Sequence, residues 1–316
     1  MAVYTEVSFD EVAAFIQALD LGHLHSVRGI ASGIENTNYF VDTGAGAYVL
    51  TLFERLTFGE LPFYLHLMQH LAARNLPVPD PVANRKGEIL HTLQGRPAAL
   101  VNRLTGASVA TPTDEQCRSV GEFLARMHLA GRDYPRHQVN PRGLDWWCDV
   151  VPVVGPLVSD EQRTLLASEL AFQQALTGSE RYGQLPKGPV HADLFRDNAL
   201  FDGGRLTGVL DFYFAGCDAL LFDIAVCLND WCVDPATGRP QDALTAAFLG
   251  GYESIRKLLS CERSMLPEMQ RAGAFRFWLS RLWDKHLPRE AKLLTAHDPG
   301  HFERLLRGLR ERTATS

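Results

Sequence analysis

One stretch of this 316-residue chain decides the fold: residues 189–201, which read PVHADLFRDNALF. It carries the pattern H-x-D-x-x-x-x-N, formed by His191, Asp193 and Asn198. A carboxylate at Asp193 can accept a proton from a hydroxyl group, and the amide oxygen of Asn198 is a ligand that suits magnesium. We expect His191 to hold the loop in place by hydrogen bonds.

A predicted hairpin follows this stretch. The apolar residues after Asn198 indicate a strand, Gly203-Gly204 indicates a tight turn because glycine tolerates positive φ, and residues 206–210 indicate the return strand. Asp211 stands at the end of that strand. The open end of the hairpin would bring Asn198 and Asp211 together, and an amide oxygen beside a carboxylate suits magnesium bound to substrate phosphates. We therefore expect both residues to be metal ligands.

The spacing is that of the kinase catalytic loop, H-R-D-x-x-x-x-N, in which the Asp accepts the proton of the substrate hydroxyl and the Asn binds magnesium. H-x-D alone is a weak signal. The full pattern is specific because a glycine turn and a strand ending in Asp211-Phe212 follow it. It predicts an ATP- and magnesium-dependent phosphoryl transfer with Asp193 as base. The alternative makes His191 a core residue, Asp193 a cap and Asp211 a carboxylate at the end of a strand.

The rest of the chain falls into a β-rich part and a helical part. The expected strands cover 25–30, 38–42, 48–53, 87–92 and 96–101, and the expected helices begin at capping boxes such as Ser8 with Glu11 and Thr113 with Gln116. We predict an α+β, two-lobed protein-kinase-like fold. Residues 1–102 would form a small N-lobe with a sheet and a crossing helix over 59–75. Residues 103–316 would form a larger, mostly helical C-lobe with the catalytic loop, metal site and acceptor pocket.

Composition narrows the possible partners. The net charge is -6, from 31 basic and 37 acidic residues, which argues against a nucleic-acid partner. The chain has no run of 18 apolar residues and no signal-peptide pattern, so we expect no membrane span and a cytoplasmic location. The six cysteines lack C-x-x-C spacing and are expected to be reduced. The sequence does not indicate an oligomeric state.

The loop resembles that of the aminoglycoside phosphotransferase and choline kinase superfamily, in which a small residue, here Ala192, separates the His and the Asp. Within that superfamily the chain resembles the bacterial homoserine kinases of this fold. The likeness rests on SGIENTNY at 32–39, YVLTLFE at 48–54, and the His191 loop with Leu210-Asp211-Phe212. This resemblance implies phosphorylation of the side-chain hydroxyl of L-homoserine by ATP, a step toward threonine.

The resemblance also implies binding residues. In the N-lobe, the turn over 32–37 would cover the nucleotide phosphates, and the linker over 99–102 would hold the adenine. The residues expected to bind nucleotide are Ser32, Gly33, Asn36, Thr37, Leu100 and Asn102.

On the acceptor side, Asp230 and Trp231 match an acidic-Trp pair that choline kinases carry near the cationic group of their acceptor. Asp230 would attract an ammonium group, unless it is a surface charge and Trp231 a core residue. Arg196, Arg276 and Arg281 are candidates to bind a carboxylate, because arginine presents a planar fork of donors.

One position departs from the kinase pattern. Kinases carry a strand lysine that neutralises the α- and β-phosphates, and this chain has Thr51 at the matching place. The homoserine kinases of this type share that change, and Arg55 or a second metal would have to replace the lysine. Rival interpretations are a kinase of another acceptor, such as an aminoglycoside, choline, ethanolamine or methylthioribose, and a nucleotide-binding pseudokinase.

Overall fold

The computed structural model describes residues 5–30, 36–287 and 298–314. The chain forms two compact units. The N-terminal unit consists of Met1–Gly106 and Thr207–Tyr213, and the C-terminal unit consists of Ala107–Leu206 and Phe214–Ser316. The predicted boundary after residue 102 lies a few residues before this division. The return strand of the predicted hairpin crosses it, so that Asp211 is grouped with the N-terminal unit.

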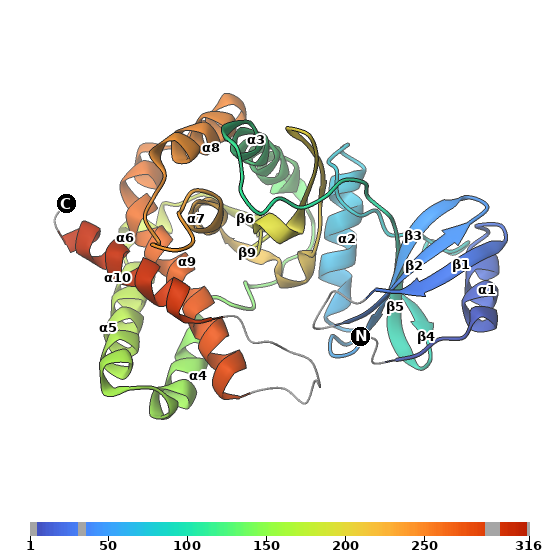
Figure 1. Cartoon of the computed structure of the whole chain (residues 1–316), viewed down its shortest axis with the longest axis horizontal. Coiled ribbons are helices and arrows are strands. Elements are labelled where there is room, and N and C mark those ends of the chain that lie inside the picture. The colour runs from blue at the N-terminus through green and yellow to red at the C-terminus, as the bar shows by residue number, and fades with distance from the viewer. Residues whose placement is uncertain (1–4, 31–35, 288–297, 315–316) are drawn as a thin grey trace. The chain divides into compact units, whose positions relative to one another are not determined.

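The N-terminal unit is an antiparallel sheet with two helices. Its elements are α1 (Phe9–Ala18), β1 (Leu24–Gly29), β2 (Asn36–Thr43), β3 (Gly46–Phe53), α2 (Leu61–Ala72), β4 (His91–Leu93) and β5 (Arg96–Asn102). The strand order is β1-β2-β3-β5-β4. Figure 1 shows α1 lying against these strands. The capping box predicted for α1 is present, with Ser8 as N-cap and Glu11 as its partner.

Alternation along β2 decides which side chains face the core of this unit. Tyr39 and Val41 are buried and pack with Val12 and Ile16 of α1. Because successive side chains of a strand point to opposite faces, Asn38 lies on the face of the sheet away from α1. It stands directly opposite Thr51 of β3. The position that carries a lysine in kinases is therefore on this second face.

The predicted strand over 87–92 is wrong for most of its length. Asn84 is the reason, because its side-chain oxygen accepts hydrogen bonds from the backbone N–H groups of Lys86 (2.9 Å) and Glu88 (3.0 Å). A further bond joins the N–H of Gly87 to the carbonyl of Asn84. These bonds form a local turn in which asparagine competes with strand pairing. The strand β4 begins only at His91.

The C-terminal unit is mainly helical. Its helices are α3 (Asp114–Ala130), α4 (Leu144–Val154), α5 (Asp160–Thr177), α6 (Glu180–Gly183), α7 (Leu220–Trp231), α8 (Asp242–Ile255), α9 (Ser260–His286) and α10 (Gly300–Ala314), with 3-10 turns η1 (Gly131–Asp133), η2 (Gly155–Leu157) and η3 (Arg196–Asn198). A further 3-10 turn, η4 (Phe212–Phe214), begins in the N-terminal unit and ends at the first residue of the C-terminal segment. The strands of the C-terminal unit are β6 (Lys187–Val190), β7 (Ala199–Asp202) and β9 (Gly216–Ala219), and β8 (Arg205–Val209) begins in this unit and continues into the N-terminal unit. β6 pairs with β9, and β7 pairs with β8.

The centre of this unit is α7, every residue of which is buried. Figure 1 shows it among α8, α9 and the β6–β9 pair. A helix that is apolar all round belongs in an interior of this kind. The polar side chains that α7 does carry, Asp223, Asn229 and Asp230, are therefore expected to have specific partners. Within the described ranges, no helix is long and apolar enough to cross a membrane.

Candidate active site

The loop that follows β6 is fastened to α7 by one carboxylate. Oδ2 of Asp223 accepts a hydrogen bond from the backbone N–H of His191 (2.7 Å), and Oδ1 accepts one from the backbone N–H of Ala192 (2.6 Å). Asp223 is fully buried. A buried charge of this kind is stable only when it is hydrogen-bonded. Asp223 therefore has a structural role in holding this loop.

Ala192 has a left-handed backbone with a φ of 63°. A non-glycine residue in this region costs about 1–3 kcal/mol and persists only where the surroundings impose it. The two bonds to Asp223 impose it here, and the buried Ala192 side chain is small enough for the turn. The next N–H, that of Asp193, donates to Nδ1 of His191 at 3.2 Å. The expected role of His191 in holding the loop is confirmed.

Both carboxylate oxygens of Asp193 contact neighbouring side chains. Oδ1 lies 3.5 Å from Nη2 of Arg276, and Oδ2 accepts a bond of 3.2 Å from Nδ2 of Asn198. The same Nδ2 also donates to the backbone carbonyl of Asp193 at 2.8 Å. The Asp193 side chain is 16% exposed, so a small molecule can reach it, whereas that of Arg276 is only 4% exposed. A neighbouring cation favours the charged form of a carboxylate, which is the form that can accept a proton.

Aromatic rings hold Arg276 in place. Its guanidinium carbon lies 3.7 Å from the ring centroid of Phe277 and 5.3 Å from that of Phe214. The Phe277 ring in turn packs on Phe195 of the catalytic loop, with 4.3 Å between centroids. Such cation-ring contacts strengthen when they are shielded from water. The loop with Asp193 and the helix α9 therefore form one packed group.

The predicted acceptor residues Arg196 and Asp230 pair with each other. Asp230 accepts three hydrogen bonds from Arg196, one from its backbone N–H at 2.9 Å and two from its guanidinium at 3.1 Å. Arg196 also donates to the carbonyl of Ala110 at 2.8 Å. Trp231 is fully buried, and its Nε1 donates to the carbonyl of Leu194 at 3.0 Å. All three predicted residues therefore support the catalytic loop.

The two predicted metal ligands occupy the two units. Asn198 ends η3 immediately before β7, in the C-terminal unit, and its amide nitrogen is turned to Asp193. Asp211 follows β8 in the N-terminal unit and has a left-handed φ of 59°, which aspartate tolerates better than most residues. The role of the pair in binding magnesium stays a prediction.

The predicted nucleotide residues have varied surroundings. Ser32 and Gly33 lie outside the described residues. Asn36 begins β2, and Thr37 is buried with its hydroxyl donating to Oε1 of Glu54 at 2.7 Å.

The predicted hinge residues belong to β5. Leu100 is buried and its carbonyl accepts from the N–H of Val82 at 2.8 Å. Asn102 is exposed, and its side-chain oxygen accepts from the N–H of Asp80 at 2.7 Å. Contacts of these residues with a nucleotide stay predictions.

Thr51, in place of the kinase lysine, belongs to a polar group within the N-terminal unit. Its hydroxyl donates to Oδ1 of Asn38 at 2.7 Å. The phenol of Tyr213 hydrogen-bonds to Thr51, and burial together with the negative charge of Asp211 raises the pKa of Tyr213 well above its usual value. Neutral groups thus hydrogen-bond to Thr51, the residue predicted to stand in place of the kinase lysine.

Sequence reasoning missed His128. This histidine is buried in α3, and its ring nitrogens contact Oδ2 of Asp223 (3.2 Å) and the hydroxyl of Tyr252 (2.8 Å). It thus supports the carboxylate that fastens the loop. A signal was available, because His128 stands four residues after Leu124, on the apolar face of its helix. The ion pair between Arg276 and Asp193 was also missed.

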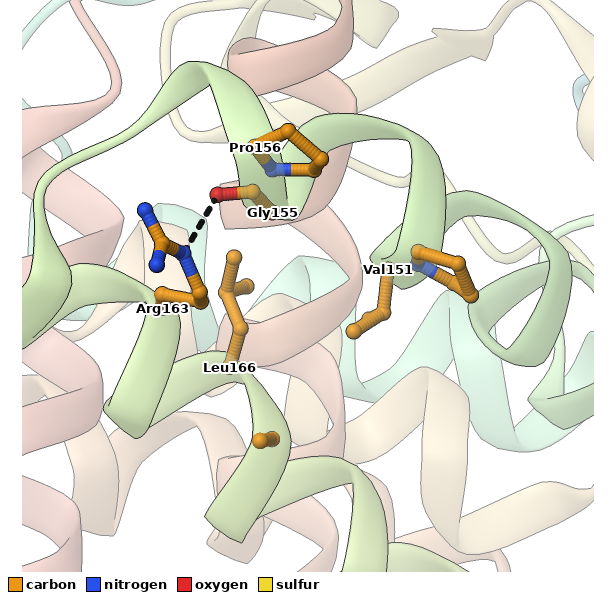
Figure 2. A pocket seen from close by; sticks show the side chains of 7 residues that line it. Val151, Gly155, Pro156, Arg163 and Leu166 are labelled. Carbon is orange, nitrogen blue, oxygen red and sulfur yellow. Dashed lines mark hydrogen bonds between the residues drawn. The ribbon is translucent and has the colours of Figure 1, made fainter.

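A pocket of about 490 Å³ lies elsewhere in the C-terminal unit, between α4, η2 and α5. Figure 2 shows Arg163 at its edge, donating to the carbonyl of Gly155, with Val151 and Leu166 on its walls. The lining residues include none of those predicted to bind nucleotide, metal or acceptor.

A buried carboxylate that fastens an H-x-D-x-x-x-x-N loop, and a hairpin that ends in Asp-Phe, define a phosphotransferase of protein-kinase-like fold. Residues 26–258 match the phosphotransferase enzyme family. The chain belongs to this family.

Two relatives within this family are similar to the chain over nearly its whole length. The chain is 62% identical over 307 residues to a homoserine kinase of Polaromonas naphthalenivorans (strain CJ2), covering 97% of each chain. It is 55% identical over 315 residues to a homoserine kinase of Burkholderia mallei (strain SAVP1), covering 97% of this chain and 95% of the other.

Solved structures share the fold at low sequence identity. The amicoumacin kinase hAmiN, in complex with AMP-PNP, Ca²⁺ and Ami, has a TM-score of 0.71 at 17% identity, over 96% of this chain and 94% of the other. A choline kinase from Cryptosporidium parvum Iowa II has a TM-score of 0.69 at 11% identity, over 98% and 96%. The predicted superfamily and fold class are confirmed.

Proposed function

We propose that this chain transfers the γ-phosphoryl group of ATP to the side-chain hydroxyl of L-homoserine, giving O-phospho-L-homoserine and ADP. The observation that carries the proposal is 62% identity, over 97% of the chain, to a protein named homoserine kinase. The product is an activated form of homoserine suited to threonine synthesis. The cytoplasm is the proposed location, which agrees with six cysteine thiols that form no disulfide.

In this proposal Asp193 is the catalytic base. Its carboxylate accepts the hydroxyl proton while the hydroxyl oxygen forms a bond to the γ-phosphorus. The bond between the γ-phosphorus and the β,γ-bridging oxygen breaks, and ADP leaves. Asn198 and Arg276 each contact one oxygen of Asp193 and so fix its direction. A positioned base and acceptor supply most of what phosphoryl transfer needs from a protein.

Asn198 and Asp211 are the proposed magnesium ligands. The donor set fits this ion, because an amide oxygen and a carboxylate are hard oxygen ligands and the phosphates of ATP supply others. Bound magnesium would neutralise charge on the phosphates. Ser32, Gly33, Asn36 and Thr37 are proposed to cover those phosphates, and Leu100 with Asn102 to hold the adenine.

Three residues are proposed to hold the acceptor site in shape: Arg196, Asp230 and Trp231. The ion pair joins η3 to α7, and the indole of Trp231 donates to the loop at Leu194. These contacts hold the loop and α7 in one arrangement beside the proposed acceptor site. A binding site that is already rigid loses less entropy when the substrate is oriented in it.

A coupled assay of ADP release with Mg-ATP tests the proposal. The panel is L-homoserine, L-serine, choline, methylthioribose and kanamycin. A strong preference for homoserine is expected. Preference for another acceptor would keep the kinase assignment and reject homoserine, and no turnover with any acceptor would favour the pseudokinase alternative.

A further inference from the structure

A site that binds an amino acid must accommodate one more charged group than a site that binds an amino alcohol. L-homoserine carries a carboxylate in addition to its ammonium and hydroxyl groups. A carboxylate leaving water must find charge-assisted donors, and the guanidinium fork matches it in geometry. The site in the C-terminal unit is rich in carboxylates, which repel a second anion. A cation with unused donors is therefore required beside the catalytic loop.

Of the three arginines expected to bind a carboxylate, two are committed to protein partners. Arg196 donates to both oxygens of Asp230 and to the carbonyl of Ala110. Arg276 is almost fully buried, forms an ion pair with Asp193 and stacks on Phe277. Taking either one for a substrate would break contacts that hold the base or the loop.

Arg281 is the third arginine, and it differs from the other two. It is partly buried, yet it forms no hydrogen bond or ion pair with any residue that the structure describes. It follows Phe277 by four residues on α9, so the two lie on the same face of that helix. Phe277 packs on Phe195 of the catalytic loop at 4.3 Å. The same helix face therefore brings Arg281 toward the loop.

The electrostatic surroundings agree with this placement. Burial lowers the pKa of Arg281, and the charges of Asp193, Asp284, Asp197 and Asp230 partly offset that effect. Asp193 is the largest of these charges in effect. Arg281 is thus within the field of Asp193, and its donors bind none of the residues that the structure describes. An arginine that is desolvated without a direct counter-ion gains from binding an anionic ligand.

We propose that Arg281 binds the α-carboxylate of the acceptor and thereby selects an amino acid over an amino alcohol. This inference rests on the proposed function. Binding at a group remote from the reacting hydroxyl affects substrate and transition state alike, so its loss raises KM more than it lowers kcat.

Two acceptors that differ only in the carboxylate test the inference: L-homoserine, and 3-amino-1-propanol, which is homoserine without that group. Arg281→Gln is expected to lower kcat/KM for homoserine by about 10- to 100-fold, the loss typical of a hydrogen bond to a charged group. For 3-amino-1-propanol the change should stay within about twofold. If the amino alcohol is not turned over, its inhibition constant against homoserine replaces kcat/KM.

Two further variants serve as controls. Arg281→Lys keeps the charge but loses the fork, so it should recover part of the selectivity, and it replaces Arg281→Gln if that variant does not fold. Arg263→Gln changes an exposed arginine on the same helix and should leave selectivity unchanged. If Arg281→Gln lowers kcat/KM equally for both acceptors, or for neither, the role of Arg281 is overturned and the proposed function is unaffected. A wild type that does not phosphorylate homoserine would overturn the proposed function as well.

Discussion

The backbone N–H of Ala192 donates a 2.6 Å hydrogen bond to Oδ1 of the buried Asp223. Together with the bond from His191, it fixes the turn that presents Asp193. Asp193, the proposed base, is thus positioned through the backbone of the two residues before it. The pair of bonds also explains why an alanine can adopt a positive φ here.

Asp223→Asn should destabilise the protein and weaken catalysis together. The amide keeps one acceptor oxygen but turns an N–H₂ group toward a backbone N–H, leaving a buried donor unsatisfied. We expect the free energy of unfolding in urea to fall by about 2–4 kcal/mol and kcat to fall in the folded fraction. Asp242→Asn, at an exposed aspartate in the first turn of α8, is the control and should change neither. An unchanged unfolding midpoint in Asp223→Asn would contradict this role.

Asp193→Asn should fold normally and bind ATP but lose most turnover. A positioned general base contributes about 100- to 10,000-fold to a rate, and a similar loss in kcat is expected. The side chain is partly exposed, so the thermal midpoint should change little. Steady-state kinetics with saturating ATP measures the effect. A variant that retained the wild-type rate would rule out Asp193 as base.

Asp211→Ala should raise the magnesium concentration needed for half-maximal activity roughly tenfold or more, because a metal ligand is lost. Titration of activity with magnesium at fixed ATP gives this value. Asp202→Ala is the matched control, because Asp202 is an exposed carboxylate at the end of β7, on the other strand of the same hairpin. The same magnesium dependence in both variants would remove Asp211 from the metal site.

Gly121→Ala should destabilise the packing of α3 on α8. A Cβ at this position would lie 2.2 Å from the carbonyl oxygen of Phe248, so the helices would have to separate. We expect a loss of about 1–3 kcal/mol in the free energy of unfolding. Gly308→Ala in α10 is the contrasting substitution, because a Cβ added there would have none of the described residues within 4 Å. It should be neutral or stabilise by up to about 1 kcal/mol, and equal effects of the two substitutions would contradict the close approach.

The parts of the site that could be predicted from sequence are local in the chain. The bond between Asn198 and Asp193 spans five residues, and the capping box of Thr113 spans three. Their residue types and spacing specify the geometry directly. The strand predicted over 87–92 failed for a local reason too, because the hydrogen bonds of Asn84 form a turn that hydrophobic alternation does not reveal.

The rest depends on contacts between distant segments. His128 meets Asp223 across 95 residues of sequence, and Arg276 meets Asp193 across the packing of α9 on the loop. No spacing rule in a single sequence specifies such pairs. The same limit applies to Asp230, which has the charge to attract an ammonium group but is held by Arg196. The sequence indicates which residue types are present, but tertiary packing determines which of them bind one another.

The central claim is that this chain phosphorylates the hydroxyl of L-homoserine through Asp193. The most direct measurement is ³¹P NMR of the reaction mixture with Mg-ATP and L-homoserine, for the wild type and for Asp193→Asn. The wild type is expected to form a phosphomonoester of homoserine in equal amount to ADP, and the variant is expected to form almost none. ADP without the phosphomonoester, or equal product from both proteins, would contradict the claim.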